Sequence, residues 1–407
     1  MSFAIAVLGL GALVLVHEAG HFFASLAVGM RPRRFYVGFP PAVLKTTRRG
    51  IEYGVGAIPL GGFVKIPGMH RPAPADVDTH LGRILGEAPE LAGPVERLRF
   101  SLAAGDHDAA RTTLARVAEL VEVRQLSAAA QKAAQKGIEE LGDALGPDAY
   151  WKAAPWKRMF VIAAGPGANV VLTLLLLTGL LMSSGGKATT RIDHIVRSTP
   201  AAPAELVGLR SGDTILAIDG TRVTAVEISH RISASRGKPI LLTVLRDGRR
   251  VQIGPVSARK NPADGVYRIG FGLHTEGLGL PAAARGSVRV TWNVTRDIGS
   301  SLGRLATGRG RKDISSPVGI VQGSSDAAKE GATSYLEILA LISLSIALLN
   351  LLPLLPLDGG HIAFSLIEGI RGRAVGREVY ERVSVVGIAL VLLLFVIGLS
   401  NDVGRLS

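Results

Sequence analysis

The sequence predicts a polytopic α-helical membrane protein with four transmembrane helices, a membrane-associated β-hairpin and an inserted extracytoplasmic α+β domain. Of the 407 residues, 47% are hydrophobic, and the mean hydropathy of +0.33 is high for a soluble protein. Four apolar stretches reach or approach the ~20 residues that a helix needs to cross a bilayer. Between these stretches, two segments combine β-formers with turn residues, which is typical of strands.

The four transmembrane segments are predicted at residues 1–30, 156–184, 336–358 and 383–400. The first has the position of a signal peptide, but it lacks a basic n-region and a small-residue cleavage site before the basic residues that follow it. We therefore interpret it as a membrane helix.

The orientation of the chain follows from Lys and Arg close to the ends of these segments, because such residues are enriched in cytoplasmic loops. All three basic clusters fall on one side of the membrane if the N-terminus is outside. Residues 30–158 and the short loop 371–382 are then cytoplasmic, and residues 187–335 and the C-terminus are extracytoplasmic. The clusters are Arg31, Arg33 and Arg34; Lys157 and Arg158; and Arg371, Arg373, Arg377 and Arg382.

The segments between the spans differ in character. Residues 31–69 alternate β-formers with glycines and predict a β-hairpin on the cytoplasmic side. Residues 70–155 are rich in Ala, Glu, Arg and Lys at helical spacing and predict a cytoplasmic helical insertion. Residues 188–276 carry alternating strands and Asp-Gly turns and predict a compact β-rich domain. Residues 277–335 predict an amphipathic, partly irregular connector, and 359–382 a cytoplasmic loop.

Charge and composition exclude several classes of function. The net charge is +13, but Arg is spread over loops without interleaved aromatic residues, so we do not expect nucleic-acid binding. The absence of cysteine excludes disulfide frameworks and Cys-based zinc sites. His70, His80 and His107 share no metal-ligand spacing, and we expect them to be solvated.

A cluster of polar residues lies within the first span. His17, Glu18 and His21 form an HExxH motif, in which two histidines at i and i+4 project from one helical face and can bind one zinc ion. The intervening Glu18 is placed to act as a general base on a metal-bound water. Because ionisable groups inside a membrane are costly unless they are paired, we interpret this motif as a metal site.

A catalytic zinc usually has three protein ligands, so a third is needed. The stretch NLLPLLPLDGGH at 350–361 ends the third span and contains Asp358 and, as a competing ligand, His361. The predicted topology places Asp358 toward the cytoplasmic side, at a depth similar to that of His17 and His21. Alternatively, Asp358 has no metal-binding role and belongs to an Asp-Gly turn at the end of a helix.

The second span contains AAGPGANVV, in which Asn169 follows three helix-opening residues, Gly165, Pro166 and Gly167. Two interpretations remain open. Asn169 either packs the helix through an interhelical hydrogen bond, or it provides an amide that holds the substrate backbone or an oxyanion.

Together these motifs resemble the site-2 protease family of intramembrane zinc metalloproteases, and most closely its bacterial branch of sigma-E-type regulators with PDZ domains. HEAGH at 17–21, GPGAN at 165–169 and NLLPLLPLDGG at 350–360 occur in the family's order. IPLGGFVKIPGM at 58–69 is similar to that branch's membrane-re-entrant β-hairpin. The domain at 188–276 resembles a PDZ domain.

The resemblance implies a site and its chemistry. His17, His21 and Asp358 would be ligands of Zn²⁺, and Glu18 would activate water. Asn169 and Asn350 would contact the substrate backbone.

The resemblance also implies the substrate and the compartment. A single-span membrane protein similar to an anti-sigma factor would add as a strand to the edge of the hairpin at Gly61 and Gly62, in the bacterial inner membrane. The PDZ-like domain would act as a size filter or docking site. The chain departs from the pattern in having one PDZ-like domain instead of two and in the helical stretch 72–150.

Two other functions are compatible with parts of the sequence. A membrane metal transporter or sensor would use the same His and Asp residues. Many transporters contain inverted repeats, which are not visible in this sequence, and a transporter would not need Glu18 between the two histidines. A PDZ-bearing scaffold with an inactive metal site is also disfavoured by the intact Glu18.

Overall fold

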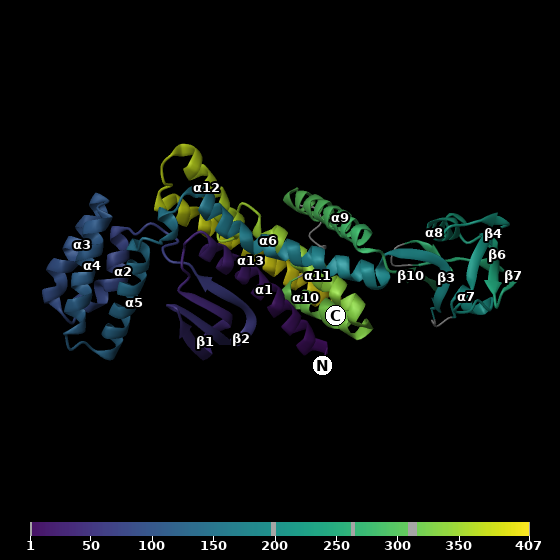
Figure 1. Cartoon of the computed structure of the whole chain (residues 1–407), viewed down its shortest axis with the longest axis horizontal. Coiled ribbons are helices and arrows are strands. Elements are labelled where there is room, and N and C mark those ends of the chain that lie inside the picture. The colour runs from purple at the N-terminus through teal and green to yellow at the C-terminus, as the bar shows by residue number, and fades with distance from the viewer. Residues whose placement is uncertain (1, 197–200, 262–264, 308–315, 407) are drawn as a thin grey trace. The chain divides into compact units, whose positions relative to one another are not determined.

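The computed structural model describes residues 2–196, 201–261, 265–307 and 316–406 (Figure 1). The chain forms two compact units, which we describe separately. One unit comprises residues 1–173 and 294–407, and the other comprises residues 174–293.

Four helices in the described part of the chain are long and apolar enough to cross a membrane, as predicted. They are α1 (Ser2–Ala27), α6 (Pro155–Leu180), α11 (Ala332–Asn350) and α13 (Arg377–Leu406). Each exposes large apolar side chains, as expected of helices whose surroundings are hydrocarbon. Examples are Leu8, Phe23, Leu175, Leu349, Val385, Val386 and Val396.

The hairpin consists of β1 (Arg34–Arg48) and β2 (Ile51–Lys65), which pair antiparallel. The first four residues of β1 have Cα partners in two segments of β2, residues 52–55 and 62–65. This double pairing is possible because the strands change register at glycines, and Gly61 has a φ of +112°, which a residue with a side chain rarely adopts. Residues 62–65 therefore form an outer segment of the hairpin.

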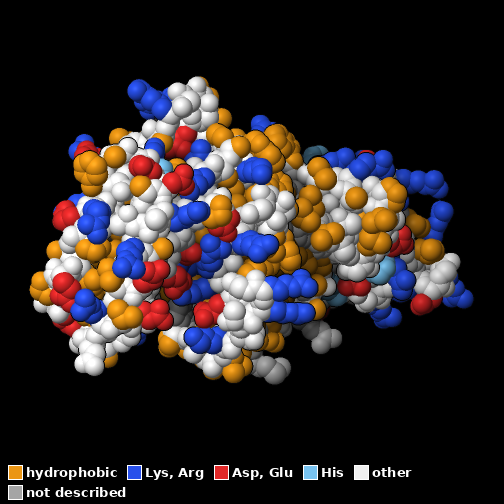
Figure 2. Space-filling view, turned by 60° about the vertical axis from the view of Figure 1, so that its left-hand side comes forward, with side chains coloured by type: hydrophobic (Ala, Val, Ile, Leu, Met, Phe, Trp, Pro, Cys, Tyr) orange, Lys and Arg blue, Asp and Glu red, His pale blue; other side chains and the backbone are white. Residues whose placement is uncertain are grey.

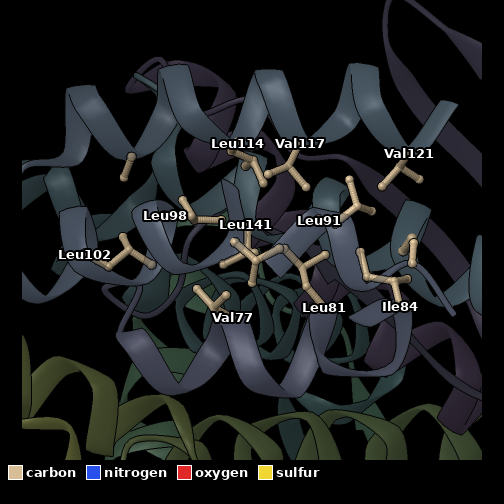
Figure 3. Close-up of a cluster of buried hydrophobic side chains, with 14 of the residues drawn as sticks. Val77, Leu81, Ile84, Leu91, Leu98, Leu102, Leu114, Val117, Val121 and Leu141 are labelled. Carbon is tan, nitrogen blue, oxygen red and sulfur yellow. The ribbon is translucent and has the colours of Figure 1, made fainter. Parts of the chain in front are cut away.

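The helical insertion is a small bundle with its own core. It contains α2 (Pro74–Leu85), a 3₁₀ turn (Pro89–Leu91), α3 (Ala92–Ala104), α4 (His107–Glu122) and α5 (Ala128–Leu145). Apolar residues at helical spacing converge between the helices (Figure 3). They include Val77, Leu81, Ile84, Leu91, Leu98, Leu102, Leu114, Val117, Val121 and Leu141. Asp106 and Ser127 cap the N-termini of α4 and α5.

Charged side chains cover the outside of this insertion. Acidic and basic side chains are interspersed on the left of Figure 2, and ion pairs such as Arg116–Glu119 and Arg124–Glu90 join them. Of the three histidines that were expected to be solvated, His70 is exposed, and His80 and His107 are half-buried. His107 contacts Arg71 and Trp151, and His80 lies 3.5 Å from Glu140, so the expectation of solvated rings was wrong for these two. His70 packs on Tyr380 but is exposed, as expected. A further 3₁₀ turn (Tyr150–Lys152) leads into α6.

The second unit holds a β-sheet with the strand order β10-β3-β4-β6-β7. Its core consists of buried aliphatic side chains such as Ile215, Ile228 and Leu242. The predicted domain boundaries enclose residues 197–200 and 262–264, which lie outside the described residues. The elements are β3 (Lys187–Ile195), α7 (Pro203–Leu206), β4 (Thr214–Ile218), β5 (Thr221–Arg222), α8 (Ala225–Ala234), β6 (Pro239–Arg246), β7 (Arg249–Ser257), β8 (Arg259–Lys260), β9 (Tyr267–Arg268) and β10 (Phe271–Glu276), with a π-helical turn (Leu181–Gly185) before β3.

The segment that was expected to be a connector is mostly helical. It forms α9 (Leu280–Ala306) and α10 (Pro317–Glu330), and part of it, residues 308–315, lies outside the described residues. The N-terminus of α10 is capped by the buried Asp402 of α13, whose carboxylate accepts hydrogen bonds from the backbone N–H groups of Ser316 and Gly319.

Two predicted boundaries at the end of the chain need correction. The third span was expected to extend through residue 358, but α11 ends at Asn350, because Pro353 and Pro356 cannot donate the helical hydrogen bonds. The expected cytoplasmic loop 359–382 contains a helix, α12 (Asp358–Arg371), and the beginning of α13. This stretch was expected to be a loop because it lies between two spans, and its arginines indicated only the cytoplasmic side. Its apolar residues recur at helical spacing, and α12 is followed by Gly372 in the left-handed region.

Candidate metal centre

Three potential ligands from the two ends of the chain converge in the first unit. His17 Nε2 lies 3.1 Å from Asp358 Oδ2, and His21 Nε2 lies 3.4 Å from the same oxygen. The two histidine Nε2 atoms are 3.2 Å apart. Both histidines are buried, and the Asp358 side chain is 17% exposed. Within the described residues, these three form the group of His and acidic side chains close enough to hold one metal ion.

The donor atoms and their separations fit a zinc ion. Ligand atoms of a tetrahedral site with zinc–ligand distances of ~2.0–2.2 Å lie about 3.3–3.6 Å apart, close to the separations among these three atoms. The set of two imidazoles and one carboxylate is a common catalytic zinc set that leaves one position open. A cation among these atoms also removes the repulsion between lone pairs that point at one another.

Helix α6 orients the ring of His21. Its Nδ1 lies 2.9 Å from the carbonyl oxygen of Val161, so Nδ1–H donates to that oxygen and Nε2 is directed toward Asp358. Gly165 leaves the space for the ring, since a Cβ there would lie 2.2 Å from Nε2. On the other helix, a Cβ on Gly20 would lie 2.3 Å from the carbonyl oxygen of Ala164. These glycines allow α1 and α6 to approach closely enough for the contact.

Asp358 is the first residue of α12, where the free N–H groups of the helix favour a negative charge. The next two residues, Gly359 and Gly360, pack closely against the turn that follows α11. A Cβ on Gly359 would lie 2.2 Å from the Leu352 carbonyl oxygen, so no larger residue fits there.

His361, the competing third ligand, is outside the cluster. Its ring lies 2.6 Å from the hydroxyl of Tyr380 on α13.

Glu18 is held by the hairpin. The backbone N–H of Val64 in β2 donates to Glu18 Oε2 at 3.0 Å. Where the strand approaches the helix, a Cβ on Gly61 would lie 3.3 Å from Cγ1 of Val14, which is a tight contact. A Cβ on Gly62 would make an ordinary contact of 3.7 Å with Cγ of Glu18, but it would lie only 2.5 Å from the Tyr36 carbonyl oxygen within the hairpin. The other carboxylate oxygen of Glu18 has no such contact with the hairpin among the described residues.

The two asparagines have different environments. Asn169 is fully buried, and neither Oδ1 nor Nδ2 has a hydrogen-bond partner among the residues that the structure describes. Its backbone carbonyl is fixed by the hydroxyls of Thr173 and Ser343. Asn350 ends α11 and is half-buried, and its Nδ2 donates to the carbonyl oxygen of Ile346 at 3.0 Å.

Sequence patterns did not indicate the two backbone groups that hold this site. Val161 and Val64 act through their C=O and N–H groups, which every non-proline residue has, so their side chains carry no signal. Gly165 was noted only as a helix-opening residue, although its missing side chain makes room for His21.

The chain is similar to a family of known proteins over nearly its whole length. Residues 5–394 match the model of Peptidase family M50. The chain is 29% identical to the Zinc metalloprotease RasP of Geobacillus kaustophilus, over 97% of this chain and 96% of that protein. It is 30% identical to the Putative zinc metalloprotease Atu1380 of Agrobacterium fabrum, over 98% and 95%. It is also 28% identical to the Regulator of sigma-W protease RasP of Bacillus subtilis, over 97% and 96%.

Proposed function

The chain belongs to Peptidase family M50, the site-2 protease family, and on this premise we propose that it hydrolyses a peptide bond in or near the transmembrane segment of a single-span membrane protein. It is a multi-pass membrane zinc metalloprotease of regulated intramembrane proteolysis. The observation that carries the proposal is the convergence of His17, His21 and Asp358 on one point beside α1, with Glu18 on the same helix.

The residues of the site have complementary tasks in this proposal. His17, His21 and Asp358 hold zinc, which when bound supplies a Lewis acid that lowers the pKa of water and polarises a carbonyl group. Glu18 accepts a proton from the attacking water and delivers it to the leaving amide nitrogen. The Val64 N–H keeps Oε2 of Glu18 occupied, which leaves the other oxygen free for the proton.

Substrate binding is proposed at three places. The substrate, once its helix has unwound, adds as a strand beside Gly61 and Gly62, where main-chain hydrogen bonds hold an extended peptide. Asn169 and Asn350 contact its backbone. The buried, unpartnered amide of Asn169 supports this role, because a native protein rarely leaves such a group unsatisfied without a functional reason.

The distribution of basic residues supports an orientation with the N-terminus and the β-rich domain outside. In this orientation the protein lies in the bacterial inner membrane, with the hairpin and the helical insertion on the cytoplasmic side. The β-rich unit acts as a PDZ-like filter that admits a substrate whose ectodomain has been shortened. The name of the Bacillus subtilis relative, Regulator of sigma-W protease, supports an anti-sigma-factor-like substrate.

The test is cleavage of a single-span model substrate by the reconstituted protein. Wild type is compared with Glu18→Gln and with the control Glu337→Gln, which removes an exposed carboxylate on α11. We expect cleavage by wild type and by the control, and loss of cleavage in Glu18→Gln with zinc still bound. Cleavage that persists in Glu18→Gln would contradict the proposal.

A further inference from the structure

The helical insertion is joined to the hairpin by a group of charged side chains, which we call the clamp cluster: Arg33, Lys65, Glu139, Asp143 and Asp148. Asp143 on α5 is at its centre. Its Oδ1 accepts a hydrogen bond from Arg33 Nε at 2.6 Å, and its Oδ2 lies 3.1 Å from Lys65 Nζ. Arg33 also pairs with Asp148 at 2.9 Å, and Lys65 with Glu139 at 3.1 Å.

The cluster is more shielded than an ordinary surface ion pair. The side chains of Asp143, Lys65 and Arg33 are 10%, 24% and 28% exposed. Pairs at this depth are less screened by water and salt than exposed pairs. Two guanidinium nitrogens of Arg33 donate to the two carboxylate oxygens of Asp148. This bidentate contact fixes the orientation of the Arg33 side chain in addition to pairing its charge.

Both basic residues of the cluster lie at one end of the outer hairpin segment. Lys65 is the last residue of β2, and its carbonyl oxygen accepts a hydrogen bond from the Arg33 N–H at 2.8 Å. Successive residues of a strand direct their backbone groups to opposite edges. The N–H of the preceding residue, Val64, therefore points to the other edge, where it donates to Glu18.

A short series of contacts thus connects the helical insertion to Glu18, the proposed general base. Asp143 holds Lys65 and Arg33, these two residues hold the end of β2, and the adjacent Val64 N–H holds the Glu18 carboxylate. A proton-accepting oxygen must lie within hydrogen-bond reach of the water it deprotonates. The position of the Val64 N–H therefore affects how well Glu18 is placed to accept the proton.

We propose that Asp143 is a positioning residue for Glu18, and that the helical insertion acts as a brace for the strand that orients this base. The inference rests on the proposed function of Glu18 and assigns a task to the insertion. Asp143 does not contact the substrate in this proposal. Its effect is transmitted through Lys65, Arg33 and Val64.

The test compares Asp143→Asn with Glu140→Gln, which removes the neighbouring carboxylate of the same helix. Glu140 pairs with His80 and Lys136 and lies outside the clamp cluster. Lys65→Met removes the partner on the hairpin side and serves as the second variant if Asp143→Asn does not fold. The measurements are kcat and KM for the single-span substrate, bound zinc, thermal unfolding, and hydrogen exchange of the Val64 amide in the full-length protein.

We expect kcat to fall on the order of tenfold in Asp143→Asn and in Lys65→Met, with KM and zinc content unchanged, because a small misplacement of a reacting group slows the chemical step. The fall in kcat of the double variant is expected to be smaller than the product of the two single falls, since both variants remove the shared Asp143–Lys65 pair. Each variant also removes one further pair, Asp143–Arg33 or Lys65–Glu139. The Val64 amide is expected to exchange faster in both variants. Glu140→Gln is expected to behave as wild type.

Three results would overturn the inference: an unchanged kcat in Asp143→Asn, an equal fall in Glu140→Gln, or a fall that accompanies loss of zinc. If the wild-type protein cleaves no single-span substrate, the proposed function fails, and exchange of the Val64 amide decides the inference separately. Faster exchange in Asp143→Asn than in Glu140→Gln supports the brace, and equal exchange overturns it.

Discussion

The ring of His21 occupies the space that a side chain on Gly165 would need. A Cβ on Gly165 would lie 2.2 Å from Nε2 and 2.5 Å from Cε1 of the ring. Helix α6 thereby shapes the metal centre through a missing side chain and through the Val161 carbonyl that accepts the Nδ1–H bond. The second span is thus part of the site although none of the three candidate ligands belongs to it.

The first prediction concerns this contact. Gly165→Ala is expected to displace the His21 ring, to lower zinc occupancy and to abolish cleavage, because the ring has no room to retain its position. Gly167→Ala is the matched control, since a Cβ on Gly167 meets nothing within 4 Å. Zinc content is measured by elemental analysis of the purified protein. Full zinc content in Gly165→Ala would contradict the packing argument.

The second prediction concerns the third ligand. Asp358→Ala is expected to lose bound zinc, because one of three converging donors is removed. His361→Gln is expected to retain it, because the His361 ring faces Tyr380 instead of the cluster. Zinc titration of the two apo-proteins measures both affinities. The opposite order of affinities would identify His361 as the ligand.

The third prediction separates the roles of Asn169. A side chain without a partner contributes no hydrogen bond to folding, so Asn169→Leu, which keeps the number and branching of the side-chain heavy atoms, is expected to leave thermal stability unchanged or higher. If the amide holds a developing oxyanion, kcat is expected to fall about 10²–10³-fold. Thermal unfolding and steady-state kinetics on the same preparation measure both. A drop in stability with unchanged kcat would instead identify Asn169 as a packing residue.

The fourth prediction concerns pH and the β-rich unit. Burial raises the pKa of Asp213, but the hydrogen bonds from Arg246 and from the Arg210 N–H outweigh this effect and leave the pKa below its ordinary value. A lowered folded-state pKa stabilises the fold above the unfolded pKa of ~3.9, and this stabilisation is lost as the pH falls through the folded value. Asp213→Asn is therefore expected to destabilise this unit at pH 7 by about 2 kcal/mol.

Urea unfolding of the full-length protein, followed by hydrogen exchange in β4 and β6, measures this difference. The gap between wild type and Asp213→Asn is expected to close as the pH falls below ~3.9 toward the folded pKa. Asp247→Asn serves as the control, because Asp247 lies in the turn between β6 and β7. A gap that is independent of pH would show that the Asp213 charge does not stabilise the fold.

Much of the fold follows from patterns that are local in the chain. The four spans are visible as apolar stretches because hydrocarbon requires a long run of apolar residues. The stretch 359–382 was expected to be a loop because it lies between two spans, but residues 358–371 form α12. A helix of this length depends on packing against its neighbours more than on intrinsic propensity, and sequence alone does not indicate that packing.

The spacing of HExxH by itself places His17 and His21 on one face of a helix, because residues four apart are neighbours there. Charge counting also predicted that Asp358 lies at a similar depth. Only the tertiary structure favours Asp358 over His361 as the third ligand, because the turn at Pro353 and Pro356 directs the first residue of α12 toward the histidines. The hydrogen bond from the Val64 N–H to Glu18 and the pairing of Asp143 with Arg33 are likewise visible only in the tertiary structure. These contacts join residues 46 and 110 positions apart, and such distant pairs meet only when packing of the whole unit brings their elements together.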